Sequence, residues 1–491
     1  MQYELKHWIA GKQIKSRRTI ARRAPATGEL LSRTCVGGKA EVDQAVTAAR
    51  LALKKWATLS LAERCGYVLG MSDWLAKEYG EAGKPAKLKD LISLEVGKPL
   101  PEADVEVIET SDFMRFFADH ASATLKNESP ELDPNLWPTK RSFIQYQPRG
   151  VVGIIKPWNY PLEMIAWSLA PALVAGNTVI IKPSEKSPAT ASLFREMAIA
   201  VGLPEGVINI VYGDAETGKL ISDARGIDFV SFTGSTAAGR DVAKRCAARL
   251  CPYAVEMGGN DAAIVLDDVD IELAANGLAW GAFCNAGQVC VGIKRAYVSR
   301  KIFPQLLAKV TAIAKSLRIG SDVGPIIDDK QLKRIREFVD DAVQKGAHIL
   351  AGGERVKSNR GYFFKPTVLT EIPAKARLLR EECFGPILPL IPFDTVEEAI
   401  SHANETPFGL GASIWTSNLE KGEMLASQVE AGMVWINDVN VAFPQTPWGG
   451  FKESGVGFEL SGDALREYTV RKHISVEMGT DQRRAWWYPY E

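Results

Sequence analysis

Short apolar runs alternate with helix-like stretches through the first half of the chain. Runs that are apolar at nearly every position are typical of strands buried on both faces of a parallel sheet. They lie at 151–155, 178–182, 207–211 and 227–233. The intervening stretches 162–174 and 189–201, and another from Ala237, have the length and composition of crossover helices. This alternation predicts a Rossmann-like α/β domain.

A weaker form of the same pattern runs through the second half. Strands are expected at 262–266, 296–298, 348–351, 367–368 and 387–391. The simplest interpretation is a second α/β domain that carries Cys290.

Other patterns precede these two domains. Gly and Pro punctuate 7–33 as short strands with turns, and helical periodicity follows over 39–75. Within it, Ser60-Leu61-Ala62-Glu63 has the form of a capping box at a helix start. The lysine-rich stretch 81–90 is expected to form an exposed loop, and a further helix is expected over 102–123.

Composition narrows the class of protein. With 491 residues the chain is too long for one core and should form two or three domains. Lys plus Arg equals Asp plus Glu at 59 each, so no net charge favours nucleic acid. No apolar run is long enough for a membrane span, and the N-terminus lacks a signal-peptide pattern. Seven irregularly spaced cysteines suit a cytoplasmic protein, and five scattered histidines predict no metal site.

Two short motifs carry candidate chemistry. Cys290 follows a Gly-Gln turn and Glu256 precedes a Gly-Gly pair, which makes them a candidate nucleophile and base. Each has an ordinary alternative. A lone cysteine is more often a small buried apolar residue, and a glutamate before Gly-Gly more often belongs to a strand end or a turn.

The motifs around these residues resemble, in content and in order, those of the aldehyde dehydrogenase superfamily. The resemblance runs from about residue 5 to near the C-terminus. It rests on FCNAGQVC (283–290), EMGG (256–259), PWNYP (157–161), KPSE (182–185), FTGST (232–236), EECFGP (381–386) and PWGGFKESG (447–455).

This resemblance implies a non-acylating NAD(P)-dependent enzyme with a Rossmann-like cofactor domain, a second α/β catalytic domain and a β-flap for oligomerisation. The expected boundaries are 1–126 and 148–257 for the NAD-binding domain, 258–455 for the catalytic domain, and 127–147 with 456–491 for the flap and C-terminal tail.

The resemblance also implies roles in the reaction. Cys290 attacks the aldehyde, Asn159 and the Cys290 backbone N–H stabilise the oxyanion, and Glu256 activates the water that hydrolyses a thioester. Asn159 has a plain alternative as a turn residue. Glu459 matches a second carboxylate proposed to relay protons, but the lysine that often accompanies it is Ser168 here, which puts that relay in doubt.

Other classes of function are weighed against the same residues. A CoA-acylating enzyme would need no base, so Glu256 argues against it. A plain cysteine hydrolase would leave the Rossmann-like half without a purpose. A binding or structural protein without turnover is disfavoured by the intact Cys290, Glu256 and Asn159.

Cofactor binding is expected at the strand ends of the first domain. Gly234-Ser235-Thr236 before a helix could hold a phosphate, although a plain N-cap is the common use of such a serine. A carboxylate at Glu185 would accept ribose hydroxyls and repel a 2′-phosphate, so NAD is favoured over NADP. The expected positions are Ile155, Pro157, Trp158, Lys182, Glu185, Gly213, Thr233, Gly234, Ser235, Met257, Glu382 and Phe384.

The expected aldehyde pocket is partly aromatic. Its lining positions are Tyr160, Met164, Trp167, Cys284, Val289, Val291 and Trp448. The three aromatic residues resemble three sides of the box of betaine and aminoaldehyde dehydrogenases, but the fourth side is Cys284. Arginines that succinate-semialdehyde enzymes often place at 167 and 284 are absent. An apolar, aromatic or amino-substituted aldehyde is therefore predicted.

The β-flap that the resemblance implies leads to a prediction of the oligomeric state. After a polar, proline-rich stretch over 127–138, the segments 141–147 and 468–476 are expected to form its strands. Exposed strands need a partner, so a homodimer or homotetramer is expected. The aromatic tail 485–491 is expected to pack on its own or an adjacent subunit, while Cys246 and Cys251 are expected to be structural.

Overall fold

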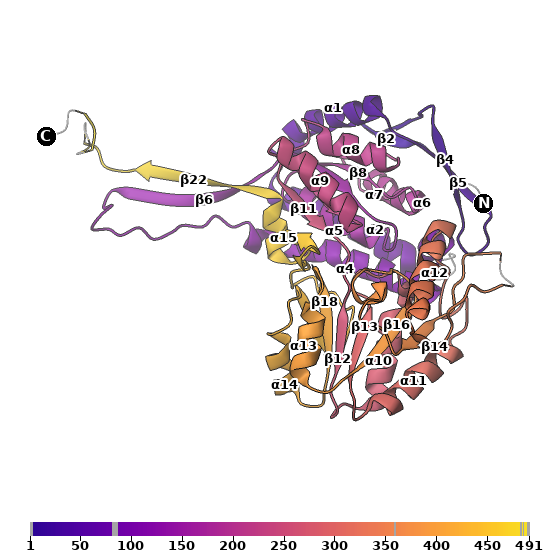
Figure 1. Cartoon of the computed structure of the whole chain (residues 1–491). Helices are drawn as coiled ribbons and strands as arrows, with labels where there is room; N and C mark the ends of the chain where they lie inside the picture. Colours follow the sequence, from indigo (N-terminus) through magenta and orange to yellow (C-terminus); the bar gives the residue numbers. More distant parts are fainter. Residues whose placement is uncertain (1–2, 81–86, 358–359, 482–483, 485, 489–491) are drawn as a thin grey trace.

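The computed structural model describes residues 3–80, 87–357, 360–481, 484 and 486–488. Figure 1 shows two lobes and a long two-stranded ribbon that leaves the body of the molecule. The first lobe is built on a sheet of eight strands and the second on a sheet of seven. The predicted α/β class is confirmed.

The first lobe contains the predicted parallel sheet, in the order β21-β11-β10-β7-β8-β9-β2-β3. Its central, parallel strands are β7 (Val151–Ile155), β8 (Thr178–Lys182), β9 (Ile208–Ile210), β10 (Phe229–Thr233) and β11 (Tyr253–Glu256). Its antiparallel edge strands are β2 (His7–Ile9), β3 (Lys12–Ile14) and β21 (Gly455–Val456). The carboxyl ends of the central strands meet at one edge, where open α/β sheets bind ligands.

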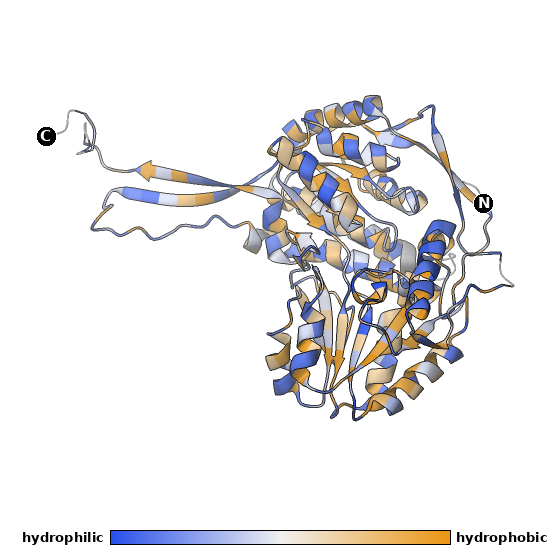
Figure 2. Ribbon diagram, viewed as in Figure 1, coloured by the Kyte–Doolittle hydropathy of each residue, from blue (hydrophilic) through white to orange (hydrophobic). Residues whose placement is uncertain are grey.

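Helices cover this sheet. They are α1 (Lys39–Trp56), α2 (Leu61–Gly80), α3 (Lys87–Val96), α4 (Leu100–Thr124), α5 (Glu163–Val174), α6 (Pro188–Ala191), α7 (Leu193–Ala200), α8 (Ala215–Asp223) and α9 (Thr236–Ala248). Helix α5 is buried at every position, which fits its nearly uniform apolar sequence. Figure 2 shows apolar residues concentrated in the strands and polar residues on the outer helices.

The structure corrects details of this lobe. The helical stretch over 39–75 is two helices, and the capping box is present: the Ser60 N–H donates to the Glu63 carboxylate at 2.7 Å. The loop expected over 81–90 is wrong for 87–90, which begin α3, while 81–86 lie outside the described residues. The lysine-rich sequence suggested a loop, but the buried face of a helix starts at Leu88. The helix expected over 189–201 is divided into α6 and α7.

The second sheet has the order β14-β15-β16-β13-β12-β18-β19, and its strands are parallel except for β14. They are β12 (Ala262–Val265), β13 (Arg295–Ser299), β14 (His348–Ala351), β15 (Thr367–Thr370), β16 (Ile387–Phe393), β18 (Gly411–Trp415) and β19 (Met433–Ile436). The sequence did not predict β18 and β19. The helices are α10 (Ile271–Phe283), α11 (Phe303–Ser316), α12 (Asp329–Gln344), α13 (Val396–Asn404) and α14 (Leu419–Ala426).

Smaller elements complete the body. Strands β1 (Tyr3–Leu5), β4 (Thr19–Arg23) and β5 (Leu30–Cys35) form a separate sheet, and β17 (Phe408–Gly409) pairs with β20 (Phe451–Lys452). The short helices are η1 (Cys284–Gly287), η2 (Arg377–Leu379) and α15 (Ser461–Glu467). Within the described residues, no helix has the length and apolar character that crossing a bilayer requires.

The ribbon is the predicted flap in simpler form. Strand β6 (Lys140–Pro148) pairs antiparallel with β22 (Thr469–Glu477), with Thr469 opposite Pro148. The stretch over 127–138 adds only an isolated bridge, Glu128 to Ile144, and not a full hairpin arm. The described part of the tail returns to its own chain, because the rings of Trp486 and Trp137 lie 6.1 Å apart. Figure 1 shows the C-terminus near the end of the ribbon.

Candidate active site

The candidate residues meet where the two lobes contact each other. Glu256 ends β11 in the first lobe, and Cys290 follows α10 and η1 in the second. The Asn159 side-chain amide donates to the Gln288 carbonyl at 3.1 Å. In return, the Asn285 amide donates to the Asn159 carbonyl at 3.1 Å. Asn159 therefore lies against the turn that leads to Cys290.

That turn has an unusual backbone. Asn285, Ala286 and Gly287 have φ values of 47°, 54° and 69°, so three consecutive residues are left-handed. Asparagine and glycine tolerate this region better than other residues. A Cβ on Gly287 would lie 2.2 Å from the Gly385 carbonyl oxygen, so no side chain fits there. The buried Lys294 ammonium donates to the Gly287 and Val289 carbonyls at 3.0 and 2.9 Å, which fixes the chain entering Cys290.

The Cys290 thiol is partly buried and has more negative than positive charge around it. Burial raises the pKa of Cys290 to about 12, and the Asp261 and Glu382 carboxylates act in the same direction. Lys294 opposes them. The thiol is therefore protonated at neutral pH, and its use as a nucleophile requires a base or an added positive charge.

Glu256 is a buried carboxyl group with no bonding partner. It is 3% exposed, and neither of its carboxylate oxygens has a hydrogen-bond partner among the described residues. Burial, then the Glu459 carboxylate, raises the pKa of Glu256 well above its usual value, while Lys156 lowers it. A Cβ on Gly455 would lie 2.9 Å from Glu256 Oε1, which places the carboxylate beside β21. No hydrogen bond joins Glu256 to Cys290.

Unlike the Glu256 carboxylate, the Glu459 carboxylate is surrounded by several hydrogen-bond donors. The Lys156 ammonium lies 2.5 Å from Glu459 Oε1 and also donates to Thr233 Oγ1 at 2.8 Å. The hydroxyls of Ser168 and Ser231 each donate to Glu459 Oε1 at 3.1 Å. Ser168 stands where relatives often have a lysine, and here Lys156 brings a cation to this carboxylate from another position. Nothing in the sequence indicates this pairing beyond a lysine directly after a predicted strand.

The start of α9 fits an anion. Ser235 is its N-cap residue, yet the serine side chain makes no capping hydrogen bond. The plain-cap alternative is therefore not what the structure contains. A Cβ on Gly239 would lie 2.4 Å from Met257 Sδ, so the helix packs closely on the residue after β11. Thr233 and Gly234 precede the cap at the carboxyl end of β10. Backbone N–H groups at such a helix end suit a pyrophosphate.

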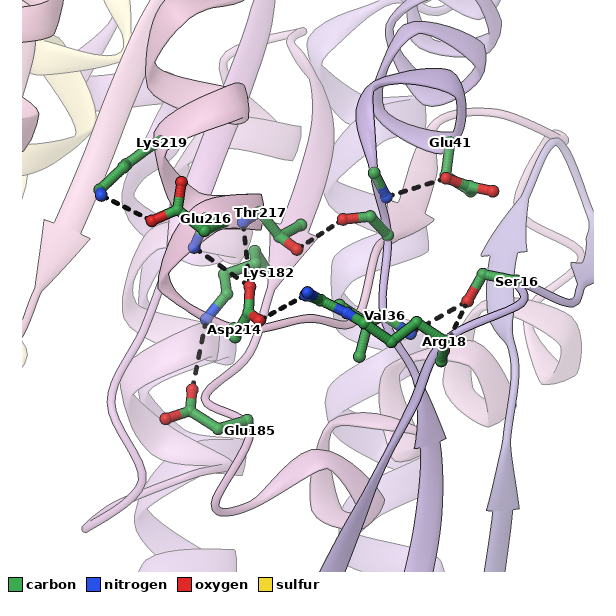
Figure 3. A network of polar contacts seen from close by, with 12 residues as sticks. Ser16, Arg18, Val36, Glu41, Lys182, Glu185, Asp214, Glu216, Thr217 and Lys219 are labelled. Atoms are coloured by element: carbon green, nitrogen blue, oxygen red, sulfur yellow. Dashed lines mark hydrogen bonds and ion pairs between the residues drawn. The ribbon is translucent and has the colours of Figure 1, made fainter.

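A second polar group lies at the carboxyl end of β8. Lys182 Nζ is 3.7 Å from the Glu185 carboxylate, and Figure 3 shows Lys182 between Glu185 and Asp214. Asp214 caps α8 and pairs with Arg18. A Cβ on Gly213 would lie 2.0 Å from Thr217 Oγ1, so the chain needs glycine there. The sequence analysis missed Asp214 and Arg18, which only the fold brings to Lys182.

The remaining residues expected to bind the cofactor lie on both sides of the contact between the two lobes. Glu382 accepts from the Gly259 N–H at 3.3 Å, and burial raises its pKa to about 7. Phe384 is left-handed, with φ of 54°, and its ring meets the edge of Trp158 at 5.7 Å. Ile155, the last residue of β7, and Pro157 precede Trp158. Residues of the two lobes thus contact each other here, through the rings of Trp158 and Phe384.

The expected pocket residues belong to one apolar cluster. Met164, Trp167, Cys284, Val289, Val291 and Trp448 are buried members, and Tyr160 and Cys290 are packed against it. Trp167 lies 5.2 Å from Trp448 and 5.4 Å from Phe113, ring centre to ring centre. Trp435 lies 6.2 Å from Trp448. Phe113 and Trp435 were not predicted.

Charged residues surround the Tyr160 side of this cluster. Lys98 lies 3.3 Å above the Tyr160 ring and pairs with Glu106 at 2.6 Å. Glu163 adds a buried carboxyl and Glu102 a half-buried one, and one oxygen of Glu163 has no hydrogen-bond partner among the described residues. Burial raises the pKa of Glu102 to about 7. This group was not predicted, because its members lie on two segments, 98–106 and 160–163, that are far apart in the chain.

A sequence profile described as the aldehyde dehydrogenase family matches residues 8–474. The 2-hydroxymuconic semialdehyde dehydrogenase of Pseudomonas sp. strain CF600 is 35% identical over 97% of this chain and 100% of its own. Aminoaldehyde dehydrogenase 1 of Pisum sativum is 35% identical over 95% of this chain and 93% of its own.

Solved structures agree with these relatives. An NAD-dependent aldehyde dehydrogenase from Sinorhizobium meliloti has a TM-score of 0.94 at 32% identity and covers 99% of this chain and 97% of its own. An NADP-dependent enzyme of E. coli has a TM-score of 0.92 at 32% identity, covering 97% and 98%. The fold and the lobe contact define an α/β oxidoreductase, and the chain belongs to the aldehyde dehydrogenase family.

Proposed function

We propose that this enzyme oxidises an aldehyde to a carboxylic acid with NAD, through a thiohemiacetal and a thioester on Cys290. The observation that carries the proposal is the pairing of two groups at the lobe contact. One is a cysteine held by a left-handed turn against Asn159, and the other is a buried carboxyl, Glu256, with both oxygens unbonded. A CoA-acylating enzyme would have no use for the second group.

The chain's own residues divide the reaction between them. Cys290 Sγ forms a bond to the aldehyde carbon, and the Asn159 amide and the Cys290 N–H stabilise the oxygen that becomes negative. When bound, NAD supplies the hydride acceptor that leaves a thioester. Glu256 then takes a proton from water as its oxygen bonds to the acyl carbon, and the carbon–sulfur bond breaks. Its raised pKa suits proton uptake near neutral pH.

The residues around Lys182 favour NAD over NADP. Glu185 and Asp214 flank this lysine (Figure 3), and both can accept ribose hydroxyls. A 2′-phosphate would add negative charge beside two carboxylates. Arg18, which would attract that phosphate, is paired with Asp214.

The pocket favours an apolar, aromatic or amino-substituted aldehyde. Trp167, Trp448 and Phe113 offer apolar faces. Burial raises the pKa of both Glu102 and Glu163, and a cationic group bound beside these carboxyls would favour their ionised form, whereas a carboxylate would disfavour it. A betaine or aminoaldehyde substrate in particular is a second candidate, supported by these carboxyls. Cys284 in place of an aromatic wall weakens it.

The test is NADH formation by purified protein with short aliphatic, long aliphatic, aromatic, amino-substituted and carboxylated aldehydes, repeated with NADP. Cys290→Ala is the control and should abolish turnover. A preference for succinate semialdehyde would contradict the proposed pocket. Turnover only when CoA is added would contradict the hydrolytic route.

A further inference from the structure

Lys156 and Glu459 form an ion pair that is shielded from water. Their atoms Nζ and Oε1 lie 2.5 Å apart, and their side chains are 0% and 2% exposed. Lys156 follows β7, while Glu459 precedes α15, more than 300 residues later. Removing two charges from water costs free energy that their attraction often fails to repay. Stability alone therefore gives little reason for this pair.

The carboxylate of Glu459 is fully engaged. Its Oε1 receives Lys156, Ser168 and Ser231, and its Oε2 also receives the Ser168 hydroxyl at 3.2 Å. The two serine hydroxyl oxygens are 2.8 Å apart, so either hydroxyl can donate to the other or to Glu459. These contacts hold the Glu459 carboxylate in one position.

The Glu256 side chain makes no hydrogen bond to any described residue. Glu256 lies opposite Thr233 in the β10–β11 register, and the Lys156 ammonium donates to Thr233. The charged groups that act on Glu256 are Glu459, Glu467 at the end of α15, and Lys156. Both carboxylates oppose its ionisation, and Lys156 counters them.

Two further titratable groups lie next to this network. Arg149 donates to the Glu467 backbone carbonyl, and the Tyr468 hydroxyl contacts Ser168 and Ser231.

We propose that Lys156 is a positioning residue for the base: its ammonium holds and neutralises Glu459, so that Glu256 can ionise and accept the proton of the hydrolytic water. This inference rests on the proposed function. It assigns the role of compensating cation to a residue in the loop after β7, which also carries Asn159, and not to residue 168.

The step that Lys156 serves is thioester hydrolysis. Water oxygen bonds to the acyl carbon, one water proton goes to the Glu256 carboxylate, and the carbon–sulfur bond breaks to leave the Cys290 thiolate and a carboxylic acid. Lys156 takes no part in this proton transfer. Its effect should therefore appear in the pH dependence of hydrolysis and not in the formation of the thioester.

The test uses p-nitrophenyl acetate without a cofactor. Acylation of Cys290 releases a burst of p-nitrophenolate, and the slower steady phase reports hydrolysis of the acetyl-enzyme. In Lys156→Met, Glu256 faces Glu459 without compensation, so the midpoint of the steady-phase pH profile should rise by roughly one unit. The steady rate at pH 7 should then fall about tenfold, with the burst retained.

Glu459→Gln is the opposing variant. It removes a negative charge and leaves Lys156 facing Glu256, so its midpoint should move to lower pH. The double variant Lys156→Met/Glu459→Gln should return toward the wild-type midpoint. A merely structural Lys156 would lower the rate at every pH and move no midpoint, and that result would overturn the inference.

Two further outcomes are also decisive. Should Lys156→Met fail to fold, judged by circular dichroism, Glu459→Gln alone decides: a lower midpoint supports the inference, and an unchanged or higher one overturns it. Absence of a burst in the wild type, or a burst that persists in Cys290→Ala, would instead refute the proposed nucleophile. The two failures are therefore distinguishable.

Discussion

At the scale of single residues, the site separates the nucleophile from the base by environment. Cys290 is held in a rigid turn with its thiol protonated, and Glu256 is a buried carboxyl without hydrogen bonds. Cys290 must lose its proton to act as a nucleophile, and Glu256 must be ionised before it can accept one. Substitutions should therefore stop the reaction at different stages.

Glu256→Gln should stop the reaction after acylation. The amide cannot accept the proton of the hydrolytic water, so turnover should fall by roughly 10²- to 10⁴-fold while the acyl-enzyme accumulates. Intact-mass measurement after mixing with aldehyde and NAD checks this, because the protein should gain the mass of the acyl group. Undiminished turnover in this variant would exclude Glu256 as the base.

The raised pKa of Cys290 predicts slow alkylation at neutral pH. With the pKa near 12 instead of its ordinary value near 9, the reactive thiolate is roughly a thousandfold scarcer at pH 7. The rate of iodoacetamide labelling at Cys290, followed by peptide mapping without cofactor, should keep rising above pH 9. A plateau below pH 8 would contradict this environment.

At the scale of elements, the left-handed turn before Cys290 holds the backbone in one conformation. Its importance can be tested by substituting Gly287 and, as a matched control, another left-handed glycine. Gly287 and Gly202 have φ values of 69° and 64°, but only Gly287 is crowded, since nothing lies within 4 Å of a Cβ on Gly202. Gly202→Ala should cost about 1 kcal/mol of unfolding free energy from backbone strain. Gly287→Ala should cost more and also reduce activity, because its Cβ would push against Gly385.

Urea unfolding and turnover of both variants check this prediction. If both variants lose the same stability and keep their activity, the turn before Cys290 can accommodate a Cβ at residue 287 without harm to the site. Restored activity of Gly287→Ala at lower temperature would point to stability and not to turn geometry.

The same scale shows what could be predicted from the sequence. Strands such as β7 and β8 are apolar at almost every position, so their burial was evident, and the Cys290 and Glu256 motifs stood out by their glycines. Segment 87–90 was misassigned because its polar residues suggested a loop, although Leu88 is buried on a helix. The Lys156–Glu459 pair could not be foreseen, because only the fold brings together residues so distant in the chain.

At the scale of the whole molecule, the ribbon is the feature that the isolated chain does not explain. Among the described residues, strands β6 and β22 pair with each other and, apart from one bridge from Glu128, with no other segment, and both lie largely outside the body (Figure 1). Their free edges offer unpaired backbone groups. We therefore expect the ribbon to pack against a second copy of the chain, as a dimer or a dimer of dimers.

Val470→Asp tests this expectation. Val470 on β22 is 48% exposed in the single chain, and a carboxylate there would be buried without a partner if a neighbouring subunit covered it. The variant should shift toward a monomer of 53.7 kDa in light scattering after size-exclusion chromatography. The matched control is Leu250→Asp, at a position that is 92% exposed and lies outside the ribbon, which should leave the mass unchanged. A wild-type protein that is already a monomer, or a Val470→Asp variant that keeps the full wild-type mass, would show that assembly does not depend on this strand.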